Sequence, residues 1–151
     1  MKIAIASDDG IHVAGHAGRS EGFVVMEYDG HAVTQREYRT SPMPGHVHAG
    51  EHHPDAHGHH HAHADTVSGS QHMHRHGGDF SDAHAQKHAR IRAALAGCDI
   101  LICGGMGHRL QTDLHQAGIT VRLTTLGNVE DAFQAWRDGR LEEQLQGFCR
   151  H

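Results

Sequence analysis

The chain has 151 residues, of which 37% are hydrophobic, and carries a formal charge of −5 when its 20 histidines are counted as neutral. This length suits one domain with a single core, and the 13 Lys and Arg residues, outnumbered by 18 acidic residues and forming no stripe, argue against a nucleic-acid partner. Three cysteines without a Cys-X-X-Cys pair argue against a disulfide framework or a zinc ribbon, and no stretch reaches membrane-spanning length, so we expect a cytoplasmic protein without a membrane partner.

The first forty residues predict a strand, a loop and a hairpin. Lys2–Ala6 is a short apolar run that predicts an interior strand, and turn residues follow it directly. The loop Ile11–Ser20 contains glycines and an arginine. It therefore has few side chains that can pack in a core, and its residue types suit ligand binding. Glu21–Tyr28 and His31–Tyr38 then predict an antiparallel hairpin around Asp29-Gly30, a two-residue turn signal, with the returning strand at a sheet edge.

A histidine-rich insertion occupies residues 45–78. It contains twelve histidines, shows neither a helical nor a strand period, and has almost no large apolar residue. Because it cannot bury enough apolar surface to offset its ordering entropy, we expect a disordered loop in the absence of a ligand. Neutral imidazole is a common ligand of Zn, Ni, Cu and Co, so the insertion is a candidate metal-binding segment; the alternative is a low-complexity linker with incidental histidines. Its candidate ligands are His57, His59, His60, His61, His63, His72, His74 and His76.

The remainder of the chain alternates helices and strands. A helix is expected from Asp79 or Ser81 to Ala96, and Gly97 ends it. The strand Cys98–Cys103 has apolar residues on both parities, which predicts an interior strand of a parallel sheet. One face of the helix predicted before this strand carries imidazoles at its N-terminal end and apolar residues at its C-terminal end: His84, His88, Ile91 and Leu95. The later predictions are a helix through Leu110, Leu114 and Ala117, a strand over Ile119–Leu126, a helix from Asn128 to Gly139, and helical turns through Leu141 and Leu145.

These elements predict a single α/β domain, residues 1–151, with a mixed, mostly parallel five-stranded sheet and helices on both faces. Ligands of such sheets collect at the carboxyl ends of the parallel strands. We therefore expect the glycine turn after Cys103, the arginine-bearing loop and the histidine end of the first helix to converge on one cavity. Glycines let a ligand approach the backbone, and the N-terminus of the next helix favours an anion. The candidate binding residues are His16, Gly18, Arg19, Cys103, Gly104, Gly105, Met106, Gly107 and His108.

Several of these residues also have a purely structural interpretation. Cys103 at a strand end can be a small buried apolar residue. His84 and His88 form a two-point metal site at i, i+4 spacing, or they are hydrogen-bonded core residues.

Motifs of catalysis are absent from the sequence, which has no GxGxxG loop, no Walker A lysine, no GxSxG and no HExxH. We therefore expect a protein that is not an enzyme.

Five motifs in this order resemble the dinitrogenase iron–molybdenum cofactor biosynthesis family, which includes nitrogenase cofactor carriers and orange proteins. They are the Asp-Asp-Gly end of the first strand, Gly15-His16-Ala17-Gly18-Arg19, the stretch Cys98–Gly107, Ala117-Gly118-Ile119, and Gly127–Ala132. The resemblance implies a three-layer ribonuclease H-like fold that holds an anionic metal–sulfur cluster, of iron–molybdenum or molybdenum–copper type, without catalysis. Ala17 stands where the family loop usually has an aromatic residue, and His108 where proline usually follows the glycine turn.

Three functions remain open at this point. The first is a carrier of a metal–sulfur cluster or metal ion in cofactor assembly, with the histidine-rich insertion as a metal-loading arm and a cofactor-assembly protein as partner. The second is a metal buffer or storage protein for Ni, Zn, Cu or Co, in which the insertion binds the metal and the domain is a scaffold. The third is a metal-responsive regulatory module.

Overall fold

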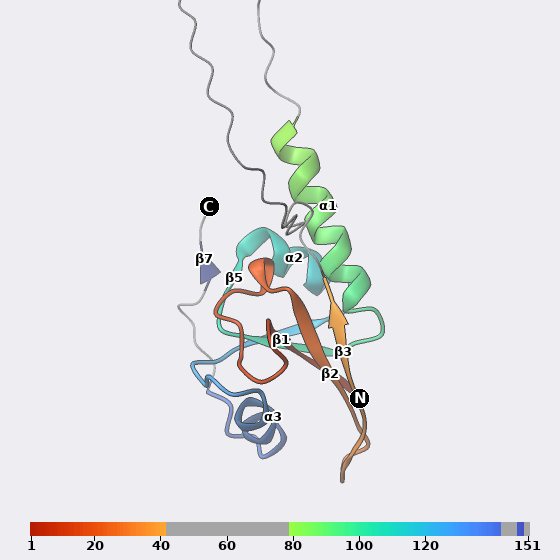
Figure 1. Cartoon of the computed structure of the whole chain (residues 1–151), viewed down its shortest axis with the longest axis vertical. Coiled ribbons are helices and arrows are strands. Elements are labelled where there is room, and N and C mark those ends of the chain that lie inside the picture. Colours follow the sequence, from red (N-terminus) through yellow and green to blue (C-terminus); the bar gives the residue numbers. More distant parts are fainter. Residues whose placement is uncertain (42–78, 143–147, 150–151) are drawn as a thin grey trace, which may run out of the picture.

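A computed structural model describes residues 1–41, 79–142 and 148–149, and shows a sheet with helices packed against it (Figure 1). Five strands pair in the order β3-β2-β1-β4-β6. Their bounds are β1 Lys2–Ser7, β2 Gly22–Tyr28, β3 Val33–Thr40, β4 Ile100–Cys103 and β6 Thr120–Leu123. The helices of this part of the chain are the 3-10 turn η1 Ala17–Arg19 and the α-helices α1 Asp79–Ala94, α2 His108–Gln116 and α3 Val129–Arg137.

The sheet is mixed. β1 is parallel to β4 and β4 to β6, whereas β2 is antiparallel to both β1 and β3. Two of the four pairings are therefore parallel, although four of the five strands run in the same direction. The predicted α/β class, the five-stranded mixed sheet and the edge position of the third strand are confirmed.

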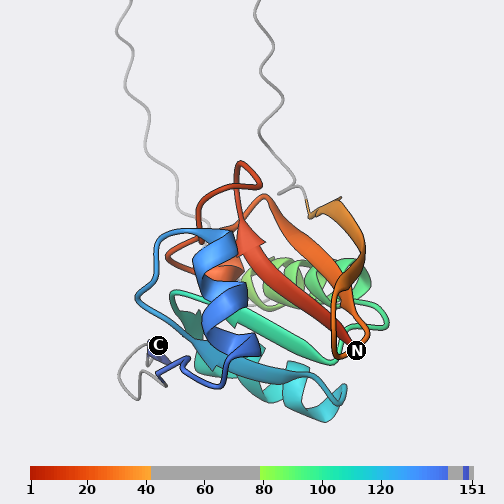
Figure 2. The same cartoon turned by 90° about the horizontal axis from the view of Figure 1, so that it is seen from below.

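Alternate residues of the central strand β1 contribute to two separate apolar clusters. Ala4 and Ala6 belong to a cluster with Leu95, which directly follows α1, and with Leu110 and Leu114 of α2. Ile3 and Ile5 belong to the other cluster, with Val129, Ala132 and Phe133 of α3. Figure 2 shows α3 in front of the sheet and α1 behind it. Successive side chains of β1 point to opposite faces of the sheet, and an apolar cluster covers each face, so the side chains of the strand are buried on both faces.

Helix α1 is fixed to the sheet by its C-terminal half. Ile91 and Leu95 are buried, while His84 is exposed and His88 is half-buried. The guanidinium of Arg39 on β3 donates to the carbonyl oxygens of Ala94 (3.1 Å) and Ala96 (2.8 Å), which satisfies acceptors that the helix end leaves open. The N-terminal half, which carries the two histidines, therefore extends beyond the sheet.

The hairpin turn is longer than the two-residue turn predicted at Asp29-Gly30. Tyr28 pairs with Val33, so four residues connect the strands, and β3 begins at Val33 instead of His31. The Asp29 carboxylate accepts hydrogen bonds from the backbone N–H groups of His31 (2.7 Å) and Ala32 (2.8 Å). These hydrogen bonds from the Asp29 side chain stabilise a four-residue connection in place of the two-residue turn that Asp29-Gly30 predicts.

The C-terminal part also differs from the prediction. The helical turns expected through Leu141 and Leu145 are not formed at Leu141, which follows α3 outside any helix, and Leu145 lies outside the described residues. Instead Phe148–Cys149 forms a short strand, β7, parallel to β5 at Met106–Gly107. The insertion at residues 45–78 and its eight candidate ligands likewise lie outside the described residues. Across the described ranges, no helix has both the length and the apolar character needed to cross a bilayer.

Replacement of Asn128 by alanine should lower the free energy of unfolding by about 1 kcal/mol, because an N-cap side chain contributes about 0.5–2 kcal/mol. The Asn128 side chain accepts from the backbone N–H groups of Glu130 (2.9 Å) and Asp131 (3.4 Å) at the start of α3. Urea denaturation followed by circular dichroism measures the change. The control Gln134→Ala alters an exposed position of the same helix and should shift stability by less than about 0.5 kcal/mol. Equal losses in both variants would rule out the capping role.

Candidate functional site

One cavity of about 300 Å³ lies where the loop after β1, the N-terminal half of α1 and the start of α2 meet. The glycine turn, the arginine-bearing loop and the histidine end of the first helix, expected to converge from the sequence, all contribute to its wall. It is lined by His16, Gly18, Arg19, His84, Lys87, His88, Gly107, His108, Arg109 and Leu110. The site therefore lies beyond the carboxyl ends of the parallel strands β1 and β4, where open α/β sheets bind ligands.

Backbone hydrogen bonds hold the loop after β1 across the end of β4. The N–H of Ala14 donates to the carbonyl of Ala6 (2.7 Å), the N–H of Gly104 to that of Ala14 (3.0 Å), and the N–H of Ala17 to that of Gly105 (2.9 Å). A Cβ atom at Gly104 would lie 2.9 Å from the Cα of Gly15, closer than a side chain tolerates. Gly104 is therefore required for the approach of two backbone segments, and not for the approach of a ligand.

Gly18 makes room for the ring of His16. A Cβ atom at Gly18 would lie 3.2 Å from Cε1 and 3.3 Å from Nδ1 of that ring, which is tighter than ordinary contact. Both residues line the cavity within or beside the turn η1. The short motif from Gly15 to Arg19 thus sets the position of one imidazole and one guanidinium together.

The wall of the cavity is cationic. Arg19, Lys87 and Arg109 all line it, and none of its ten lining residues is acidic. Burial lowers the pKa of Lys87, and the charge of Arg19 lowers it further, so the two cations act on each other. The first turn of α2 also faces the cavity, and its N-cap, Gly107, provides no side-chain cap for the free N–H groups. These charges and the helix dipole favour an anionic ligand.

Imidazoles occupy the wall on both sides. His16 and His108 come from η1 and α2, and His84 and His88 come from α1. Nδ1 of His88 lies 2.6 Å from a carboxylate oxygen of Asp113 on α2, so a hydrogen bond joins the two helices beside the cavity. Among the described residues, no three histidine, cysteine or acidic side chains lie close enough together to enclose a metal ion.

Four of the predicted binding residues do not line the cavity. Cys103 and Met106 are fully buried in the core, and Gly104 and Gly105 hold the loop through their backbones. Burial raises the pKa of the Cys103 thiol to about 12, although N–H groups of Gly105 and Ala17 oppose this rise. Without a metal the thiol therefore stays protonated at neutral pH. The structure places Cys103 in the core, in the position of a small apolar residue, and not on the wall of the cavity.

Three residues of the site were not identified from the sequence. Lys87 lies between His84 and His88 on the same helix and could have been found by extending their stripe. Arg109 directly follows His108 in the first turn of α2, where a basic residue is unusual because it opposes the helix dipole. No sequence signal connects Asp113 with His88, because the pair depends on how two helices cross.

Comparisons with known proteins agree on the family and the fold. Residues 1–139 match the family model described as dinitrogenase iron–molybdenum cofactor. Among curated protein sequences, none matches this chain. Solved structures resemble it over nearly the whole chain, at identities of 11–21% that show a shared fold.

Three of the solved structures that are similar to this chain have TM-scores of 0.55 or 0.56. The apo form of the orange protein from Desulfovibrio gigas is 20% identical with a TM-score of 0.56, covering 95% of this chain and 92% of that chain. A candidate dinitrogenase from Methanocaldococcus jannaschii is 11% identical with a TM-score of 0.55, covering 96% and 95%. The NMR structure of a candidate NifB protein from Thermotoga is 21% identical with a TM-score of 0.55, covering 94% and 91%.

The Cys103 thiol should resist alkylation by iodoacetamide at pH 8 in the folded protein. The reactive species is the thiolate, and a folded-state pKa of about 12 leaves almost none of it at that pH. Mass spectrometry of the peptide containing Cys103 measures the rate of modification, with the same peptide from protein unfolded in guanidinium chloride as the control. Equal rates in the folded and unfolded protein would show that the thiol is accessible and ionised, and would restore it as a candidate ligand.

Proposed function

The chain belongs to the dinitrogenase iron–molybdenum cofactor family, and from this membership we propose that its cavity binds an anionic metal–sulfur cluster, which the protein carries without catalysing a reaction. The cargo we propose is of the iron–molybdenum or molybdenum–copper type. Its partner would be a cofactor-assembly protein in the cytoplasm. The proposal also includes the finer fold assignment, a ribonuclease H-like arrangement of the mixed sheet and its helices.

The cationic wall is the observation that carries this proposal. Three flexible cations and a helix N-terminus face a cavity whose lining contains no carboxylate. Charge-assisted hydrogen bonds to an anion are the strongest that such side chains make, and they are strengthened where water is partly excluded. A volume of about 300 Å³ is at the small end of ligand sites, which suits a compact inorganic cluster better than a nucleotide or a peptide.

The chemistry of the lining supports carriage in preference to turnover. The ten lining residues include no serine, threonine, cysteine, aspartate or glutamate, so the usual oxygen and sulfur nucleophiles and carboxylate bases are missing from the wall. Imidazole nitrogens can coordinate exposed metals of a cluster, and the cations can contact its sulfide surface. We therefore favour binding without reaction, in which the imidazoles act as ligands and not as acids or bases.

Tetrathiomolybdate is a suitable probe, since it is an anionic metal–sulfur species that absorbs visible light. The double variant Arg19→Gln, Lys87→Gln should bind it about tenfold more weakly or worse, because a hydrogen bond to a charged group contributes about 1.5–3 kcal/mol and both side chains are partly exposed. Equilibrium dialysis at low ionic strength, read by absorbance, gives the dissociation constants. Affinity should also fall as salt is added, because salt screens the attraction.

A matched control is the double variant Arg137→Gln, Arg140→Gln, which also removes two cations, here from exposed positions at the end of α3 where both pair with Asp138. Wild-type affinity is expected for this variant. If the control loses as much affinity as the Arg19→Gln, Lys87→Gln variant, the anion responds only to net charge. If the Arg19→Gln, Lys87→Gln variant binds like the wild type, the cavity is not the binding site and the proposal fails.

A metal-buffer function has its own support, namely the twelve histidines of residues 45–78. Replacing this segment by a short Gly-Ser linker distinguishes the two functions. A carrier should keep its affinity for tetrathiomolybdate, because the cavity residues remain, whereas a buffer should lose nearly all of its capacity for Zn²⁺. Dialysis with each probe, on the intact and the shortened protein, measures both quantities. Loss of tetrathiomolybdate binding in the shortened protein would contradict a site formed by the domain alone.

A further inference from the structure

The hydrogen bond between His88 and Asp113 resembles the support of a metal ligand. Nδ1 of His88 lies 2.6 Å from the carboxylate, whose oxygen accepts the hydrogen bond, so the proton of the neutral ring is on Nδ1. The side chains of the pair are only 18% and 36% exposed, which protects the interaction from water. Such a carboxylate fixes the tautomer, leaves Nε2 as the coordinating nitrogen and raises its basicity.

His84 provides a second imidazole on the same face of α1. Residues four apart on a helix lie one above the other, and His84 and His88 both line the cavity. Two imidazoles at this spacing can bind one ion as a chelate, with nitrogen ligands that suit Zn, Ni, Co and Cu. Their position on one rigid helix means that little further ordering is needed when the ion binds.

We propose that His84 and His88 bind a transition-metal ion at the wall of the cavity, and that Asp113 is the positioning residue of this site. No third ligating side chain of the described residues is close enough to complete the shell. Within the described part of the chain, the remaining positions of the ion would be filled by water or a small anion. Arg19, Lys87 and Arg109 of the same cavity oppose its charge, and Asp113 offsets part of this repulsion through the ring that it holds.

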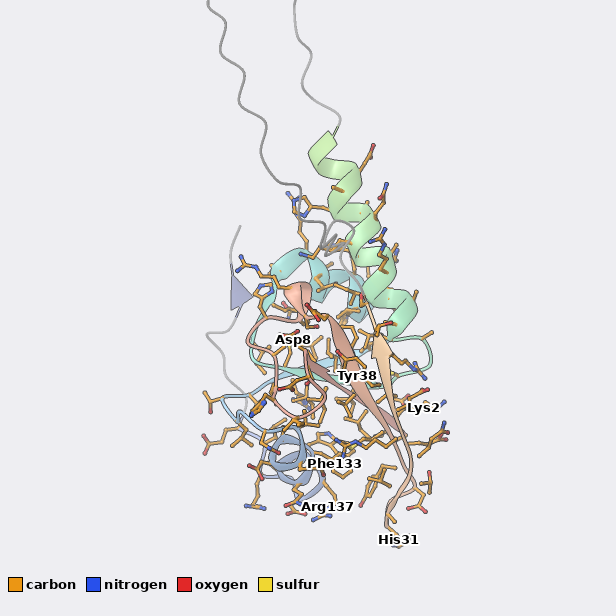
Figure 3. All side chains as sticks on the ribbon, viewed as in Figure 1. Lys2, Asp8, His31, Tyr38, Phe133 and Arg137 are labelled. Atoms are coloured by element: carbon orange, nitrogen blue, oxygen red, sulfur yellow. The ribbon has the colours of Figure 1, made fainter. Side chains whose placement is uncertain are left out.

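This site shares the cavity with the proposed cluster, and it is tested without a cluster so that the two proposals can fail separately. The full chain, labelled with ¹⁵N, is titrated with ZnCl₂, and the histidine ring nitrogens are followed by long-range ¹H–¹⁵N correlation spectra. At saturation, Zn²⁺ should shift Nε2 of His84 and of His88, while Nδ1 of His88 keeps its proton. His31, at the hairpin tip and at the far end of the molecule from the start of α1, serves as the internal reference ring (Figure 3). Unchanged rings of His84 and His88 at saturating Zn²⁺ would overturn the proposal.

Variants separate a metal site from a simple link between helices. Asp113→Asn should weaken Zn²⁺ binding at His88 by about 10- to 100-fold, the usual effect of removing an outer-shell partner, and His88→Ala should abolish the shift at His84. His115→Ala, an exposed position on the same helix as Asp113, is the matched control and should leave both shifts unchanged. If Asp113→Asn keeps the wild-type Zn²⁺ affinity while lowering the melting temperature, Asp113 acts only as a structural link and its assigned role is wrong.

The test of zinc binding at His84 and His88 and the test of anion binding at Arg19 and Lys87 have independent outcomes. Zinc is measured here in the absence of tetrathiomolybdate, and the anion was measured above in the absence of zinc. Zinc shifts at His84 and His88 together with wild-type anion binding by the Arg19→Gln, Lys87→Gln variant would sustain the metal site and reject the cluster proposal. The reverse pattern would reject the metal site alone.

Discussion

The contact between Gly104 and the Ala14–Gly15 backbone is the constraint on which the site depends. It lets the loop after β1 lie directly on the end of β4, where the N–H of Gly104 reaches the carbonyl of Ala14 and the N–H of Ala17 reaches that of Gly105. Because these bonds fix the turn η1, His16 and Arg19 face the N-terminal half of α1. A side chain at residue 104 would separate the two segments and widen the cavity, whatever the lining residues were.

The cavity combines two kinds of chemistry that usually exclude each other. Cations from η1, α1 and α2 favour an anion, while two imidazoles of α1 are the ligands that we propose for a metal ion. The carboxylate of Asp113 makes this combination possible, because it places a negative charge behind the ring of His88, outside the lining. The ring of His88 is thus paired with a negative charge, while Arg19, Lys87 and Arg109 have no acidic neighbour in the lining.

The sequence predicts much of the fold because the signals are local. The apolar run at Lys2–Ala6, the two-sided run before Cys103 and the cap at Asn128 each determine an element through neighbouring residues. The predictions are wrong where the local structure depends on a side-chain hydrogen bond or on pairing with a distant segment of the chain. Asp29 widens the hairpin by binding two backbone N–H groups, and Phe148–Cys149 pairs with Met106–Gly107 across the chain.

The same distinction explains the candidate site. His84 and His88 were found through their spacing on one helix, whereas Asp113 could not be, since its role depends on the packing of α1 against α2. Chain connectivity adds a further constraint: the histidine-rich insertion ends at residue 78, and α1 begins at Asp79, five residues before His84. The candidate ligands of the insertion and those of the cavity are therefore consecutive along one chain; if both bind metal, an ion released by the first would be at high effective concentration for the second. An experiment that removes the insertion while preserving α1 therefore separates the contribution of the insertion from that of the cavity.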